Sequence, residues 1–149
     1  QNLDVLELPD ASFDIAFSSL TLHYLTALDD VLRTVRRSLV GGGAFVFSQE
    51  HPIYTAPSRP AFVPSSDGSL TWPLDGYLRE GPRVTDWLAP GVVKQHRTIG
   101  TLLAAFVGAG FVLDALVEWQ PSPEQLAEHP EWDLELDRPM FLLGRAIAV

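Results

Sequence analysis

An amphipathic segment between two short apolar runs limits the possible fold more than any other feature of this sequence. Residues 13–19 form an apolar run that ends in small polar residues, as a short strand does. Residues 28–39 repeat Leu and Val at three- and four-residue spacing and begin with Asp29 and Asp30, which favour a helix start. Residues 44–47 are continuously apolar, as in a strand buried on both faces. Together they form a βαβ unit, which predicts a parallel α/β sheet.

The rest of the chain continues this alternation of strands and helices. The run Gly41–Gly43 is expected to end the first helix. After residue 91 the pattern predicts a strand over 92–96, a helix from Thr98 or Thr101 to about Ala109, a strand over 111–117, an acidic helix capped by Ser122, and a last strand over 140–148.

Residues 52–91 differ in composition and in periodicity from the segments on either side. They hold seven of the twelve prolines, and neither the helical nor the strand period persists. Aromatic residues nevertheless recur, which disordered segments lack: Tyr54, Phe62, Trp72, Tyr77 and Trp87. A long loop inside a compact domain is usually functional. We therefore expect an ordered insertion that packs over one end of the sheet.

Composition excludes several classes of function. The 149 residues suit one domain, and the net charge of −9 argues against nucleic acid or an anionic membrane as the main partner. The chain has no cysteine, which excludes disulfides and thiolate catalysis and fits a cytoplasmic location. No apolar run reaches the roughly 18 to 20 residues that a membrane-spanning helix needs.

The segment Leu8-Pro9-Asp10-Ala11-Ser12-Phe13-Asp14, followed by Phe17-Ser18-Ser19-Leu20 and His23-Tyr24, resembles a stretch of the class I S-adenosylmethionine-dependent methyltransferases. In that family such a turn leads into the fourth strand of the sheet. The later features occur in the family's order, so the resemblance extends over almost the whole chain. It implies a three-layer, Rossmann-like α/β sheet, reduced to about strands four to seven, with the last strand antiparallel.

The resemblance also implies one partial methyltransferase domain over residues 1–149. Its parts are a strand–helix–strand core (1–51), an insertion or lid (52–91), and a C-terminal helix with a strand hairpin (92–149). The family's Gly-rich cofactor loop has no counterpart, because Gly41–Gly43 follow a helix and precede a strand. We expect a C-terminal portion that is inactive alone. Its strand at 13–19 would form an apolar sheet edge able to pair with another chain.

Five residues are implied to contact the cofactor, S-adenosylmethionine. The resemblance places the Asp4 carboxylate at the adenine amino group, with the backbone N–H of Val5 beside it. It places Ser18, Ser19 and Leu20 at the adenosine or methionine part, past the carboxyl end of a strand. The alternatives are a solvated terminal Asp4 and an ordinary strand-to-helix turn.

A second group of residues is expected to line the substrate cleft. His23 and Tyr24 follow the cofactor turn, and Arg97 could bind a carboxylate, although a structural ion pair is the alternative. Trp72 and Tyr77, together with Trp87, could form a lid over the sulfonium cation or an aromatic substrate. They could equally form a small satellite core that holds the insertion together.

His51 is the candidate general base, since Glu50-His51 closes a strand at the same edge of the sheet. It could instead gate the following loop, because methyl transfer needs a base only if the acceptor must lose a proton. The four histidines (23, 51, 96 and 129) have no HxH or HExxH spacing, so no metal site is expected.

The predicted function is methyl transfer from S-adenosylmethionine to a small-molecule acceptor. A degenerate methyltransferase-like module that binds a partner or regulates an active homologue is the non-catalytic alternative. An NAD(P)-dependent oxidoreductase is disfavoured, since there is no Tyr-x-x-x-Lys pair and Lys94 is the only lysine.

Overall fold

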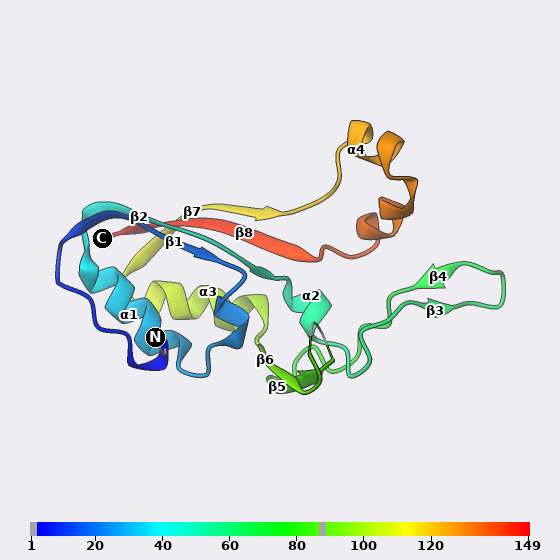
Figure 1. Ribbon diagram of the computed structural model, residues 1–149, viewed down its shortest axis with the longest axis horizontal. Helices are drawn as coiled ribbons and strands as arrows, with labels where there is room; N and C mark the ends of the chain where they lie inside the picture. Colours follow the sequence, from blue (N-terminus) through cyan, green and yellow to red (C-terminus); the bar gives the residue numbers. More distant parts are fainter. Residues whose placement is uncertain (1–2, 87–88) are drawn as a thin grey trace.

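The computed structural model describes residues 3–86 and 89–149 and is built on a four-stranded sheet (Figure 1). The strand order is β1-β2-β8-β7. β1 and β2 are parallel, and β8 runs antiparallel to both of its neighbours. These strands are β1 (Phe13–Ser19), β2 (Leu39–Glu50), β7 (Phe111–Glu118) and β8 (Phe141–Ala148). The predicted α/β sheet and its antiparallel strand are confirmed.

Two helices cover one face of this sheet, α1 (Leu28–Ser38) and α3 (Ile99–Gly108) (Figure 1). The core lies between these helices and the sheet. Phe47 of β2 stacks on Phe106 of α3 with 4.6 Å between ring centroids, and both side chains are fully buried. Two short 3-10 helices, η1 (Leu3–Val5) and η2 (Leu22–Tyr24), flank β1 in the sequence.

Local sequence signals explain where the helices begin and end. α1 buries Leu28, Val31, Leu32 and Val35, which is the apolar stripe predicted from their spacing. α3 begins after Thr98, whose hydroxyl oxygen accepts a hydrogen bond from the Thr101 N–H at 3.1 Å. The next strand follows Gly110, which has a φ of 90° that favours glycine.

The glycine run does not end α1, and that prediction was wrong. The helix ends at Ser38, and Gly41–Gly43 lie inside β2. Leu39 is already extended and almost fully buried, and it pairs with Phe13 of β1. Backbone hydrogen bonds from Ser12 to Ser38 and from Ala11 to Arg37 tie this junction to β1. Pairing with β1 therefore ends the helix at Ser38, two residues earlier than a stop at Gly41 would allow.

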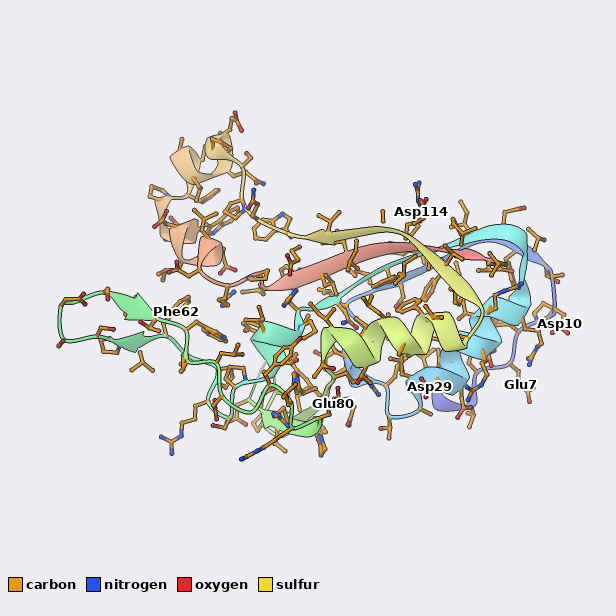
Figure 2. The ribbon with its side chains drawn as sticks, turned by 180° about the vertical axis from the view of Figure 1, so that it is seen from behind. Glu7, Asp10, Asp29, Phe62, Glu80 and Asp114 are labelled. Carbon is orange, nitrogen blue, oxygen red and sulfur yellow. The ribbon has the colours of Figure 1, made fainter. Side chains whose placement is uncertain are left out.

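The opposite face of the sheet remains exposed in the described part of the chain. Ile15 and Phe17 of β1 are 67% and 72% exposed, and Val112 of β7 is also exposed. An ion pair between Asp114 and Arg145 bridges β7 and β8, and Figure 2 shows Asp114 on the side away from α3. β1 forms one edge of the sheet, next to this exposed apolar surface.

The insertion forms α2 (Pro52–Thr55), one complete hairpin and the first strand of a second hairpin, all outside the main sheet. β3 (Val63–Pro64) and β4 (Leu70–Thr71) form an arm that projects from the molecule (Figure 1). β5 (Gly81–Thr85) pairs with β6 (Val92–His96), the strand predicted from residues 92–96. The insertion is thus ordered where it is described, while Trp87 lies outside the described residues.

A short helical segment connects β7 to β8 at the far ends of those strands (Figure 1). It consists of α4 (Pro123–Glu128) and the 3-10 helix η3 (Pro130–Leu136). Ser122 caps α4 as predicted, through a reciprocal pair of hydrogen bonds with Gln125. In residues 3–86 and 89–149, none of the helices combines the length and apolarity required to span a bilayer.

Candidate functional site

The carboxyl ends of β1 and β2 meet at one edge of the sheet. Ser19 pairs with Ser48, and the Leu20 N–H donates to the Ser48 carbonyl oxygen at 2.9 Å. Leu20 has a φ of 48°, so the chain turns sharply directly after β1. Two residues beyond Ser48, Glu50 closes β2 at this same edge. Open α/β sheets bind ligands outside such carboxyl ends.

A cavity of about 270 Å³ lies beside the end of β1. Leu3 and Leu6 from the η1 region line one side, and Ser18, Ser19 and Thr21 are among the residues that line the other. The remaining lining is largely apolar. A few hydroxyl and backbone groups at the rim of an apolar space suit a flat heteroaromatic ring.

Two of the sequence-predicted cofactor residues lie in η1. The backbone of Asp4 and Val5 runs between Leu3 and Leu6, and the Val5 side chain is exposed. The Asp4 side chain lies outside the described part, so its predicted contact stays a prediction. Ser18 and Ser19 line the cavity of 270 Å³, while Leu20 contributes to a shallower apolar hollow with Trp119 and Leu143.

A larger cavity of about 590 Å³ lies past the end of β2. Its walls come from α2, the segment 56–60, β5, and Asp75, Gly76 and Arg79. Glu50 and Lys94 also line it, and these are two buried charged side chains in an otherwise mixed surface. The insertion and the core sheet therefore enclose this space together.

Glu50 and Lys94 form a buried ion pair at the larger cavity. The Lys94 Nζ donates to Glu50 Oε1 at 2.5 Å, and the two residues are 3% and 7% exposed, Lys94 being the more buried. Burial raises the pKa of Glu50, while the hydrogen bond and charge of Lys94 oppose that rise. A carboxylate is thus held in a poorly solvated position next to open space.

His23 lies against the same carboxylate. Its Nδ1 accepts a hydrogen bond from the Glu50 backbone N–H at 3.2 Å, and its Nε2 lies 4.0 Å from Glu50 Oε1. Burial first, and then the charge of Lys94, lowers the pKa of His23 from 6.5 to about 4. His23 is therefore neutral at pH 7, and the Tyr24 ring packs against it, tilted by 46° with 4.2 Å between ring centroids.

One aromatic residue of the insertion lines the larger cavity, and others pack behind it. Tyr54, which lines the larger cavity, stacks on Trp72 at 5.5 Å, and the Trp72 Nε1 donates to the Ile53 carbonyl oxygen. The guanidinium of Arg138 packs on both rings and on Phe62, at 4.7–5.4 Å from the ring centroids. Figure 2 places Phe62 where the β3–β4 arm joins the body. Trp72 therefore supports Tyr54 and holds the arm in place.

Both ring nitrogens of His51 are engaged in hydrogen bonds. Its Nδ1 accepts from the Ile53 N–H at 3.0 Å and caps α2, and its Nε2 lies 2.9 Å from Glu118. The side chain is completely buried, and burial lowers its pKa. To act as a base, His51 would have to break one of these hydrogen bonds.

Tyr77 holds the insertion against the core, whereas Arg97 contacts the loop that follows η2. The Tyr77 hydroxyl oxygen accepts from the Ile99 N–H at 3.1 Å, and its carbonyl oxygen lies 2.8 Å from His96 Nε2. The Arg97 Nη2 donates to the carbonyl oxygen of Leu25 at 2.5 Å. Glu80, labelled near the start of α3 in Figure 2, accepts from the Thr98 N–H. The structure does not bring Tyr77 or Arg97 to the lining of the larger cavity.

Acidification is expected to destabilise the protein through His23. The folded state holds this residue neutral down to a pKa of about 4, whereas the unfolded chain binds a proton below 6.5, so stability falls as the pH drops between these values. The loss from His23 alone is about 2 kcal/mol at pH 5. Urea unfolding at pH 7 and pH 5 measures it, and His23→Gln should show a shallower decline.

Part of the decline should remain in His23→Gln, because burial also lowers the pKa of His51 and His96. Glu50 acts in the opposite direction, since its pKa is raised. An equally steep decline in wild type and His23→Gln would contradict this role for His23.

Lys94 is the site residue that sequence reasoning missed. Its one available signal was that the only lysine of the chain interrupts the apolar run Val92-Val93. Glu50 was noted beside His51, but the residue that it contacts lies 44 positions away in the sequence. No local pattern connects two positions at that distance.

Comparison with known proteins gives consistent matches. Residues 1–47 match a family model described as a methyltransferase domain. The crystal structure of an S-adenosylmethionine-dependent methyltransferase from Mesorhizobium loti is 53% identical with a TM-score of 0.94, covering 99% of this chain and 67% of that one. The crystal structure of a protein from Listeria monocytogenes, provisionally described as an S-adenosylmethionine-dependent methyltransferase, is 32% identical with a TM-score of 0.87. That match covers 100% of this chain and 67% of the Listeria chain.

A relative of uncharacterized function from Haemophilus influenzae is 30% identical over 146 residues. The match covers 94% of this chain and 56% of the relative. The chain therefore spans little more than half the length of that protein.

Proposed function

Since this chain belongs to the S-adenosylmethionine-dependent methyltransferase family, we propose that the protein transfers a methyl group from S-adenosylmethionine to a small molecule. The observation that carries this proposal is the pair of cavities at the carboxyl edge of the sheet, one past β1 and one past β2. The hydrogen bond from Leu20 to Ser48 connects the ends of these two strands.

The smaller cavity fits the adenosine part of the cofactor. Its apolar lining suits the purine ring, and Ser18 and Ser19 offer polar groups at the strand end. Asp4 and Val5 lie in the segment between Leu3 and Leu6, and we assign them to the adenine edge. When bound, S-adenosylmethionine supplies an electrophilic methyl group on a positively charged sulfur.

The larger cavity fits the methyl acceptor. A volume of about 590 Å³ lies in the range of small-molecule sites. The net charge of −9 disfavours a nucleic acid as the acceptor. Tyr54, Asp75 and Arg79 would hold the acceptor in line with the methyl group. Such alignment is itself a large part of the catalysis of methyl transfer.

Calorimetric titration of S-adenosylhomocysteine into the gene product that contains these residues tests the proposal. We expect binding in the micromolar range, and binding that is at least ten-fold weaker in Ser18→Phe, because the ring fills the smaller cavity. Ser66→Phe, on the exposed turn of the β3–β4 arm, is the matched control. Thermal unfolding establishes that both variants are folded.

The two ways in which this test can fail have different meanings. If wild type does not bind S-adenosylhomocysteine, the proposed methyl transfer is wrong for this protein. If Ser18→Phe binds it as tightly as wild type, the cofactor lies elsewhere than in the smaller cavity.

A further inference from the structure

One carboxylate oxygen at the larger cavity has no hydrogen-bond partner. Lys94 Nζ occupies Oε1 of Glu50, but Oε2 is buried and has no partner within residues 3–86 and 89–149. An unsatisfied buried oxygen on a charged group is costly to a folded protein, and almost all such groups are paired. The site is therefore complete only when a donor reaches Oε2.

The neighbouring side chains do not supply that donor. His23 contributes Nδ1 to the Glu50 backbone N–H, and its Nε2 is 4.0 Å from Oε1, beyond hydrogen-bond distance. Tyr54 packs on Trp72 and Arg138, and no hydrogen bond joins it to Glu50 in the described residues. What adjoins the carboxyl group instead is the cavity of about 590 Å³ that Glu50 itself lines.

We propose that Glu50 binds the nucleophile of the methyl acceptor through an N–H or O–H group that donates to Oε2, and that Glu50 takes its proton. This inference rests on the proposed methyl transfer and narrows it to methylation at nitrogen or oxygen. The acceptor's N–H or O–H bond breaks, and its proton goes to Oε2. The freed electron pair forms the new bond to the methyl carbon, and the old carbon–sulfur bond breaks with its electrons left on sulfur.

The charges of the site agree with this step. The carboxylate loses its negative charge as the cofactor sulfur loses its positive one, so the total charge at the site does not change. Burial raises the pKa of Glu50, which makes it a better proton acceptor near neutral pH. Lys94 is a positioning residue, since it holds Oε1, while Oε2 has no partner among the described residues.

The pairing also selects the kind of acceptor. Glu50 and Lys94 together carry no net charge, so the site has no excess negative charge to attract an ammonium group. A neutral hydroxyl, amine or amide N–H is the matching donor. A site built around one such hydrogen bond discriminates strongly against the analogue that lacks the donor.

The probe pair 2-naphthol and 2-methoxynaphthalene tests the inference, because the two ligands differ only in having an O–H or an O–CH3 group. We expect the naphthol to bind wild type about ten-fold more tightly, as measured by NMR titration. In Glu50→Gln the amide oxygen takes the place at Lys94 and an NH2 faces the cavity, so the preference should disappear. Glu118→Gln removes the same charge at His51 and should retain it.

Equal affinity of the two probes for wild type would overturn the inference, as would a preference that survives in Glu50→Gln. Failure of both probes to bind wild type would also count against a cavity that recognises hydrogen-bond donors of a ligand. The 13C chemical shift of the Glu50 carboxyl group in 13C-glutamate-labelled protein gives a second readout. This shift should change when 2-naphthol is added and should not change when 2-methoxynaphthalene is added.

Neither measurement requires S-adenosylmethionine, so the two proposals can fail separately. Binding of S-adenosylhomocysteine without the naphthol preference would leave methyl transfer intact and remove the role of Glu50. A naphthol preference without cofactor binding would leave Glu50 as a residue that binds O–H donors, and it would remove both the methyl transfer and the proton transfer that depends on it.

Discussion

Replacing Lys94 with methionine is expected to lower the free energy of unfolding by about 3–5 kcal/mol, because it leaves the Glu50 carboxylate buried without its cation. The pair is joined at 2.5 Å, and both side chains are almost fully buried. Methionine keeps the length and most of the packing of lysine, so the loss reports the charge rather than a cavity. Urea unfolding at pH 7 measures it.

The pH dependence of this loss gives a second test. Burial raises the pKa of Glu50, and loss of Lys94 removes the interactions that oppose the rise. The folded variant then binds a proton at a pH where the unfolded chain does not, so its stability should increase as the pH falls towards the pKa of Glu50. This change in stability on lowering the pH is opposite in sign to the change expected from His23.

Two further variants separate the ion pair from nonspecific effects. The double variant Glu50→Gln with Lys94→Met should recover a large part of the loss, because no buried charge remains. Arg33→Met breaks the exposed pair with Asp30 and should cost less than about 1 kcal/mol. A loss in Lys94→Met as small as that in Arg33→Met would contradict the buried pair.

Gly144→Ala is expected to destabilise the protein by about 3 kcal/mol, although it adds only one methyl group. A Cβ at Gly144 would lie 2.3 Å from Cζ and 2.6 Å from Cε1 of Phe47. That ring cannot move freely, because it is buried and stacked on Phe106. The β8 backbone is hydrogen-bonded to both β2 and β7, so it cannot shift either.

A smaller partner at position 47 should relieve this clash. Phe47→Leu alone loses buried contacts, but combined with Gly144→Ala it should cost less than the sum of the single changes. Gly108→Ala, at the end of α3 with no atom within 4 Å of the added Cβ, should leave stability nearly unchanged. Strict additivity of the two changes would contradict a direct contact between positions 47 and 144.

The elements that sequence predicted best are those with complete local signals. The buried stripe of α1 follows from Leu and Val spacing, and the start of α3 follows from Thr98. The junction at Gly41–Gly43 was misplaced because strand pairing with Phe13 begins earlier than the glycines. The hairpins of the insertion were not predicted, because β3 and β4 are two residues long and β5 contains Gly81 and Pro82.

The candidate site divides in the same way. Ser18–Leu20 could be placed at a ligand edge from sequence, since the end of a parallel strand is itself a local feature. His51 was selected as a base for its residue type, but its two ring nitrogens contact Ile53 and Glu118. Glu118 belongs to a strand 67 positions away, so this environment could not be read from the chain.

Sequence alone therefore determined the order of the main-sheet strands and the helices that cover them, the α/β class and the resemblance to methyltransferases. These depend on side-chain period and capping, which act over a few neighbouring residues. Only the tertiary structure decided that Lys94 meets Glu50 and that Phe47 fills the space above Gly144. Such contacts form between segments that are far apart in sequence, and burial then changes the charge preferences and the steric limits of the residues involved.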